Sequence, residues 1–169
     1  LNKKTGDLIW NITWGSKGWD EANGHIFVCP NRVYVAGRYN ATNMLLGGEA
    51  LLVSFDKTDG RYIKHTTWSE GGTADYLGMT GDSQFLYAVG TSTRGGDKIV
   101  LHKYDRELGR IWAGEWEGSG SEASRAVEVT PRGEGLVVVG KTTSYGNGSF
   151  DALLLKYDLE GKLLWSRIW

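Results

Sequence analysis

Hydrophobic residues occur along the chain in short runs that are separated by turns rich in Gly and Asp. Some runs, such as LVVV (136–139) and ALLL (152–155), are apolar at successive positions, which is typical of a strand covered on both faces. Others, such as GKLLWSRIW (161–169), place two Trp residues four positions apart, on the same face of an extended strand. With 25 Gly, 8 Trp and 8 Tyr but only 2 Pro, the pattern predicts short twisted strands joined by Gly turns.

These runs recur with a period of about 50 residues. The glycines of one turn are 54, 49 and 52 residues apart, and the tryptophans that follow them are 54, 48 and 53 residues apart. Glycines that end a second run are spaced by 53 and 50 residues, and aspartates that end a third run by 49 and 53. In the same order, these residues are Gly6, Gly60, Gly109 and Gly161; Trp14, Trp68, Trp116 and Trp169; Gly37, Gly90 and Gly140; and Asp56, Asp105 and Asp158. Four markers that stay in phase indicate an internal repeat.

Each repeat predicts four strands. In the third repeat these are ASRAVEV (123–129), GLVVVG (135–140), LLLKYD (153–158) and GKLLWSRIW (161–169). The turns DKTDG, DRELG and DLEG precede the fourth strand, because Asp can cap the backbone and Gly tolerates a positive φ. A unit of this length with four antiparallel strands is typical of a β-propeller blade rather than of a solenoid coil of about 20–29 residues.

The predicted fold is all-β, with three propeller blades over about residues 15–68, 69–116 and 117–169. Residues 1–14 are expected to form one extra outer strand, over Gly6–Trp14, that belongs to a preceding blade. Since one blade cannot bury its own faces, we interpret the recurrent Trp of the fourth strand as an apolar contact between neighbouring blades. Closed propellers usually have about 4–8 blades. The chain is therefore either a segment of a longer propeller or a subunit whose extra strand joins another copy.

Two stretches resemble known propeller repeats. TGDLIW (5–10) resembles the tryptophan-docking motif of quinoprotein-type propellers, in which a TGK-like turn leads to a Trp that locks the blades. The longer stretch 146–169 is similar to the β-propeller repeats of archaeal and bacterial surface proteins, and the resemblance extends repeat by repeat over the whole chain. Two positions depart from the docking motif, since Lys64 stands where Trp is expected and Trp112 comes one residue early. These departures weaken the link to the quinone enzymes.

Composition narrows the function classes. The 19 Lys and Arg residues balance 20 Asp and Glu residues, which leaves no field to attract nucleic acid or anionic lipid. No apolar run approaches the length of about 20 residues that a membrane span needs. The single cysteine, Cys29, cannot form an internal disulfide and is interpreted as a buried structural thiol.

No catalytic or metal-binding spacing is found, and we expect neither a cofactor nor an enzyme activity. The three histidines, His25, His65 and His102, occupy different repeat positions, so the repeat brings no pair of them together. A quinoprotein-type enzyme would need a closed ring around its cofactor, which three blades do not provide.

One side of the predicted blades carries the longer and more variable loops, which join second to third strands and fourth to first strands. Exposed aromatic and Arg side chains are typical of binding surfaces. Alternatively, rings such as Trp19 and Phe150 fold back over the blade edge. The candidate binding residues of this loop face are Trp19, Arg38, Tyr39, Arg94, Tyr145 and Phe150.

Three of the seven Asn residues lie in glycosylation sequons: Asn11 in NIT, Asn40 in NAT and Asn147 in NGS. This suggests an extracellular or cell-surface protein. The predicted function is a non-enzymatic module for structural assembly or protein–protein interaction, whose partners are copies of itself or further blades of the same chain. The alternative is a domain that recognises a glycan or peptide through the loop face.

Overall fold

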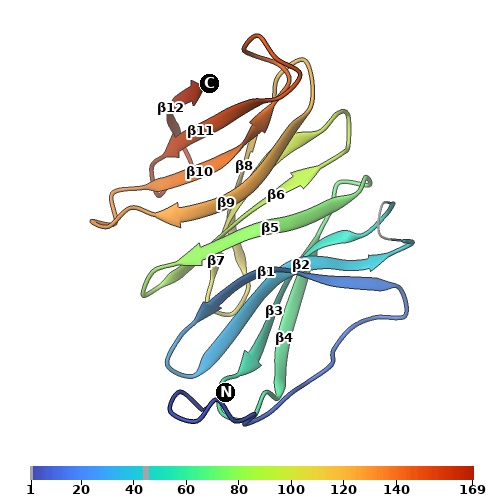
Figure 1. Ribbon diagram of the computed structural model, residues 1–169, viewed down its shortest axis with the longest axis vertical. Coiled ribbons are helices and arrows are strands. Elements are labelled where there is room, and N and C mark those ends of the chain that lie inside the picture. Colours follow the sequence, from blue (N-terminus) through green and yellow to red (C-terminus); the bar gives the residue numbers. More distant parts are fainter. Residues whose placement is uncertain (1, 44–45) are drawn as a thin grey trace.

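The computed structural model describes residues 2–43 and 46–169, and within these ranges the regular structure consists of antiparallel β-strands. Twelve strands form three four-stranded sheets, and each sheet is a meander in chain order (Figure 1). The prediction of an all-β fold with antiparallel strands is therefore confirmed. Sheet 1 contains β1 (Trp19–Val28), β2 (Arg32–Ala41), β3 (Glu49–Asp56) and β4 (Tyr62–Trp68); sheet 2 contains β5 (Ala74–Gly81), β6 (Phe85–Ser92), β7 (Lys98–Asp105) and β8 (Arg110–Trp116); and sheet 3 contains β9 (Glu122–Val129), β10 (Leu136–Thr142), β11 (Asp151–Tyr157) and β12 (Leu163–Ile168).

The three sheets follow one another along the longest axis of the molecule, with the N-terminus beside sheet 1 and the C-terminus beside sheet 3 (Figure 1). The first strands of successive sheets, β1, β5 and β9, pack against each other. We call the side of each sheet that faces its predecessor the front face, and the side that faces its successor the back face. Each sheet contains one recurrent Gly (Gly37, Gly90 or Gly140) and one recurrent Asp (Asp56, Asp105 or Asp158). We call residues of different sheets repeat counterparts when they lie at the same distance along the sequence from these markers.

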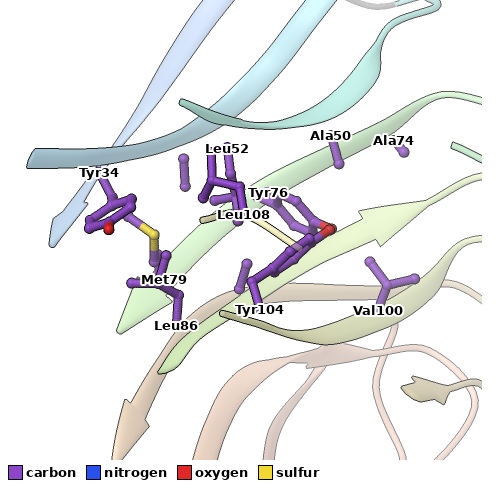
Figure 2. Packing of buried hydrophobic residues seen from close by; sticks show 12 residues of the cluster. Tyr34, Ala50, Leu52, Ala74, Tyr76, Met79, Leu86, Val100, Tyr104 and Leu108 are labelled. Atoms are coloured by element: carbon purple, nitrogen blue, oxygen red, sulfur yellow. The ribbon is translucent and has the colours of Figure 1, made fainter. Parts of the chain in front are cut away.

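Two apolar cores hold the sheets together. Between sheets 1 and 2, the residues of β2 and β3 meet those of β5, β6 and β7, and Figure 2 shows Tyr34 beside Met79 and the rings of Tyr76 and Tyr104 side by side. Strands β3 and β7 are buried at nearly every position, because both of their faces are covered. The core between sheets 2 and 3 consists of Tyr87, Val89, Ile99, Leu101, Val127, Leu136, Val138, Leu153, Leu155 and Tyr157.

In the turns before the fourth strands, Asp caps the backbone as predicted, but Gly takes the positive φ in only two of the three turns. Asp56 Oδ1 accepts a hydrogen bond from the Thr58 amide at 2.8 Å, and Asp105 Oδ1 accepts one from Gly109 at 2.8 Å. The residue with positive φ in the middle turn is Leu108 (φ 62°), whereas the other two turns use Gly60 (φ 76°) and Gly161 (φ 87°). Leu108 is buried in the core between sheets 1 and 2, which holds it in this unfavourable conformation.

This turn geometry explains the apparent shift of Trp112. Counted from the residue with positive φ, Trp112 follows Leu108 by four positions, as Trp165 follows Gly161. Trp112 is therefore in register with the other docking positions, and counting from Gly109 gave the wrong impression that it comes early.

The predicted extra strand over Gly6–Trp14 is not formed, and this part of the prediction is wrong. Residues 6–16 have no strand pairing, and the segment runs along the front face of sheet 1. An isolated strand has no partner for its backbone hydrogen bonds. The repeat counterpart of this segment, β12, pairs with β11. Among residues 2–43 and 46–169, no strand pairs with Gly6–Trp14. We call Gly6–Trp14 the cover segment.

Candidate functional site

The contacts between successive sheets repeat in detail, and the first of them is a tryptophan on a turn. Trp112 of β8 donates from Nε1 to the carbonyl oxygen of Leu159 at 3.1 Å, in the turn of sheet 3. Its ring lies over Gly161, where an added Cβ would come within 3.0 Å of the indole. The turn glycine therefore provides the space for the ring as well as the positive φ.

Trp10 of the cover segment makes the same contact with sheet 1. Its Nε1 donates to the carbonyl oxygen of Lys57 at 3.1 Å, and its ring lies over Gly60. Lys57 is the repeat counterpart of Leu159, and the two hydrogen bonds span the same 47 residues of sequence. Although the cover segment is not a strand, its Trp is docked in the manner of β8.

The contact between sheets 1 and 2 uses other side chains in place of this tryptophan. At Lys64 the docking Trp is absent, and the carbonyl oxygen of Arg106, the repeat counterpart of Lys57 and Leu159, accepts two other hydrogen bonds. The Tyr34 hydroxyl donates to it at 2.9 Å and Arg32 donates at 2.8 Å. No sequence signal indicates this replacement, because both donors come from β2 rather than from the fourth strand.

The second recurrent Trp packs onto the front face of the following sheet. Trp68 lies edge to face with His102, with ring centroids 4.5 Å apart. Trp116 packs against the core between sheets 2 and 3. Trp14 lies between Tyr39 and Tyr62, at centroid distances of 5.7 and 5.5 Å. These three tryptophans therefore have related environments.

Backbone hydrogen bonds join the loop ends in the same repeated way. The Ala74 amide at the start of β5 donates to the Gly48 carbonyl at 3.1 Å, and the Glu122 amide at the start of β9 donates to the Asp97 carbonyl at 3.1 Å. Gly48 and Asp97 both directly precede the third strand of their sheet. The two joints are therefore built alike in backbone as well as side-chain contacts.

The back face of sheet 3 is exposed to solvent. Its positions alternate along β10 and β11 with the residues that pack onto sheet 2. Val139 is 41% exposed and Trp169 is 69% exposed. In sheet 2 the repeat counterpart of Val139 is Val89, which is 0% exposed because sheet 3 covers it. The residues that define this face are Val137, Val139, Leu154, Trp165 and Trp169, and their covered counterparts are Tyr87, Val89, Leu101, Trp112 and Trp116.

The front face of sheet 1 is the other end of the stack. The cover segment lies on its outer part and leaves an apolar groove of about 270 Å³ between Trp10, Ile12, Trp14 and the sheet. Asp20 and Glu21 line the same groove. The sheet residues of this face are Val33, Val35, Leu51, Val53 and Phe55, and their counterparts in sheet 3 are Leu136, Val138, Leu153, Leu155 and Tyr157, which pack onto sheet 2.

The predicted loop-face residues are spread over the three sheets rather than gathered in one site. Arg38 is buried and forms an ion pair with Glu21 at 3.2 Å, and Tyr39 packs on Trp14. Both belong to sheet 1, as does Trp19, whose side chain is 48% exposed. Arg94 is exposed in the loop after β6.

The remaining two loop-face residues lie beside sheet 3. Tyr145 is 48% exposed, with its ring centroid 5.7 Å from that of Trp116. Phe150 is half exposed, and the ammonium group of Lys141 lies 3.8 Å from its ring centroid. Neither ring is folded fully over the edge of the sheet.

A buried polar cluster distinguishes the joint between sheets 1 and 2. The Tyr76 hydroxyl lies 2.5 Å from His102 Nδ1 and 2.6 Å from the Tyr104 hydroxyl, and His102 Nε2 is buried without a hydrogen-bond partner. Burial, assisted by the charge of Arg110, lowers the pKa of His102 to about 3. Burial also raises the pKa of Tyr76 well above its usual value. The histidine is therefore neutral in the folded protein, and its counterparts in sheets 1 and 3 are the apolar Val53 and Leu155.

The three sequon asparagines Asn11, Asn40 and Asn147 are all exposed. Asn40 lies at the end of β2, with a positive φ of 52°, rather than within the following loop. In residues 2–43 and 46–169 there is no group of three or more His, Cys, Asp or Glu side chains placed to hold a metal ion. The same part of the chain contains no helix with the length and hydrophobicity required to cross a membrane.

No protein-family model matches the sequence, and a search of curated proteins finds no match.

Proposed function

We propose that the chain is a β-propeller-type assembly module that extends its stack of sheets by adding further sheets of the same kind at its two end faces. The added sheets come from other copies of the chain or from further blades of the same polypeptide. In this role the protein is not an enzyme, and it works outside the cell or at the cell surface, where the exposed sequon asparagines could carry glycans.

The observation that carries this proposal is the exposed back face of sheet 3. Val139 and Trp165 are 41% and 39% exposed, although their counterparts in sheet 2 lie under the next sheet. Exposed apolar side chains gathered on one face are typical of a protein interaction site. Within the molecule, surfaces with the same repeat pattern are covered by the front face of the following sheet, so the same kind of surface is the expected partner.

Charge supports this pairing. Lys141, Lys156 and Arg167 lie on the back face of sheet 3. Lys156 is paired with Val137, Arg167 is paired with Leu154, and Lys141 comes two positions after Val139. Asp20 and Glu21 line the groove on the front face of sheet 1, where Glu21 also forms the ion pair with Arg38. Opposite charges around two apolar faces favour joining the back face of one copy to the front face of the next.

A single charge placed in the back face tests the proposal. Leu154→Glu puts a carboxylate at the centre of the apolar surface, and Ile111→Glu is the matched control, because Ile111 is 49% exposed on β8 away from both end faces. In sedimentation velocity over a concentration series, we expect the wild-type chain and Ile111→Glu to associate and Leu154→Glu to stay monomeric. A wild-type chain that remains strictly monomeric at all concentrations would overturn the proposal, as would equal association of the three proteins.

Recognition of a glycan or peptide by the loop face is the second candidate function. It is favoured by the exposure of Trp19, Tyr145 and Phe150, which are each about half exposed at loop ends. Substituting Tyr145 separates the two functions, because loss of ligand binding with unchanged association supports recognition.

A further inference from the structure

The cover segment and β12 are two versions of the same element. Both carry Gly, then an apolar pair, then two Trp residues four positions apart, at Gly6, Trp10 and Trp14 and at Gly161, Trp165 and Trp169. Within the chain, β8 shows what such an element does at a joint. Its Trp112 docks on the turn of the following sheet.

If the back face of one copy packs on the front face of a second copy, β12 of the first and the cover segment of the second meet at the same site on sheet 1. If the back face of sheet 3 lies on a second copy as sheet 2 lies on sheet 3, Trp165 meets the turn at Lys57 and Gly60. That turn already holds Trp10, through its hydrogen bond to Lys57 and its contact over Gly60. Trp169 would likewise meet the position of Trp14. Close-packed side chains cannot share this space.

We infer that the cover segment is a built-in competitor of β12, which occupies the front face of sheet 1 and has to leave before a second copy can join there. This inference rests on the proposed function and adds to it the identity of the contact surface and a limit on the association of copies. The partner is the back face of sheet 3, with β12, of a second copy.

The way in which each element is held decides which of the two leaves. Strand β12 is hydrogen-bonded along β11 from Leu163 to Ile168. The cover segment has no strand pairing, and the backbone hydrogen bonds near it close only the turn between Asn2 and Asp7. Its attachment to sheet 1 therefore depends mainly on Trp10 and Trp14. The cover segment is the weaker element and gives way to β12.

Equivalent substitutions in the two elements should have opposite effects. Trp10→Ala with Trp14→Ala frees the front face, so we expect the concentration at which half of the chains are associated to fall by at least about tenfold. Trp165→Ala with Trp169→Ala removes the same side chains from β12, and we expect that concentration to rise by a similar factor. The measurement is sedimentation velocity or light scattering over a concentration series. Because the two pairs are alike in chemistry and repeat position, a general loss of aromatic surface cannot produce opposite signs.

A third variant combines Trp10→Ala and Trp14→Ala with Leu154→Glu. It shows whether the stronger association of the double variant occurs through the back face of sheet 3. It is expected to be monomeric. If it associates like the double variant, the gain is nonspecific and the inference fails.

Thermal unfolding of dilute samples checks that sheet 1 remains folded. If the double variant proves unfolded, hydrogen exchange of the wild type replaces it, and exchange in residues 6–14 should rise with concentration. Unchanged exchange on association overturns the inference.

The results separate this inference from the function on which it rests. If the wild type associates through the surface disrupted by Leu154→Glu but the loss of Trp10 and Trp14 has no effect, the competitor role fails and the assembly function stands. If the wild type does not associate at any concentration, the assembly function fails, and the competitor role, which rests on it, fails with it.

Discussion

The buried histidine between sheets 1 and 2 predicts a specific loss of stability in acid. His102 is 0% exposed and its pKa in the folded protein is about 3, against 6.5 for the free side chain. The unfolded chain therefore binds a proton below about pH 6.5 that the folded chain does not take up. Because the pKa is depressed on folding, stability is lost as the pH falls below the unfolded value, and the loss levels off near the folded value.

The magnitude follows from the two pKa values. Each pH unit between them removes about 1.4 kcal/mol from the free energy of unfolding. At about pH 4.5, two units below the unfolded pKa, the contribution of His102 amounts to about 2.7 kcal/mol. This is a large share of the stability of about 5–15 kcal/mol that is typical of a folded domain.

His102→Leu isolates this contribution, because Leu155 occupies the corresponding position in sheet 3. Urea unfolding followed by Trp fluorescence, at several pH values between about 6.5 and 4.5, should give a shallower loss for His102→Leu than for the wild type. The difference in slope should approach about 1.4 kcal/mol per pH unit. His25→Leu on β1 is the control and should keep the wild-type slope. Equal slopes for His102→Leu and the wild type would refute the reasoning, since the acid loss would then come from other groups.

Two further predictions concern the docking tryptophan and the sequons. Trp112→Phe keeps an aromatic ring on the turn but removes the hydrogen bond from Nε1, so we expect the free energy of unfolding to fall by about 1–2 kcal/mol in urea unfolding, whereas the half-exposed Trp19→Phe should change it by less than about 0.5 kcal/mol. An unchanged stability for Trp112→Phe would show that the bond does not hold the joint. If the protein is exported, the intact mass of material from its native source should exceed that of the bare polypeptide by whole glycans, and Asn11→Gln, Asn40→Gln and Asn147→Gln should each remove one. A bare mass would contradict the extracellular proposal.

Much of the fold could be predicted from the sequence, because each strand carries its own signal. The phase of Gly37, Gly90 and Gly140 marks the second strands, and Asp56 caps its own turn through a bond that spans only two residues. Such local features need no information about the rest of the molecule. The pattern also predicted correctly that Trp68 and Trp116 lie between sheets.

The sequence was less informative wherever a distant partner decides the outcome. Gly6–Trp14 has the pattern of a strand, but strand formation depends on a neighbouring strand that the pattern cannot supply. The hydrogen bond from Tyr34 to Arg106 replaces a docking Trp across 72 residues, and no local signal indicates it. The sequence pattern predicts Arg38 and Tyr39 as exposed loop residues. In the structure Arg38 forms an ion pair with Glu21, and the ring of Tyr39 packs on Trp14.

By itself the sequence determined the number of repeats, the strands within each repeat and the side chains that could join one unit to the next, because periodicity and turn chemistry are properties of short stretches. Only the tertiary structure decided which faces are covered and which stay open. Burial depends on what lies opposite a surface, so Val89 and Val139 share a repeat position and yet one is inside the molecule and the other is at its end. The same physical reason makes Trp10 a docked ring on sheet 1 and leaves Trp165, in the same pattern, facing solvent.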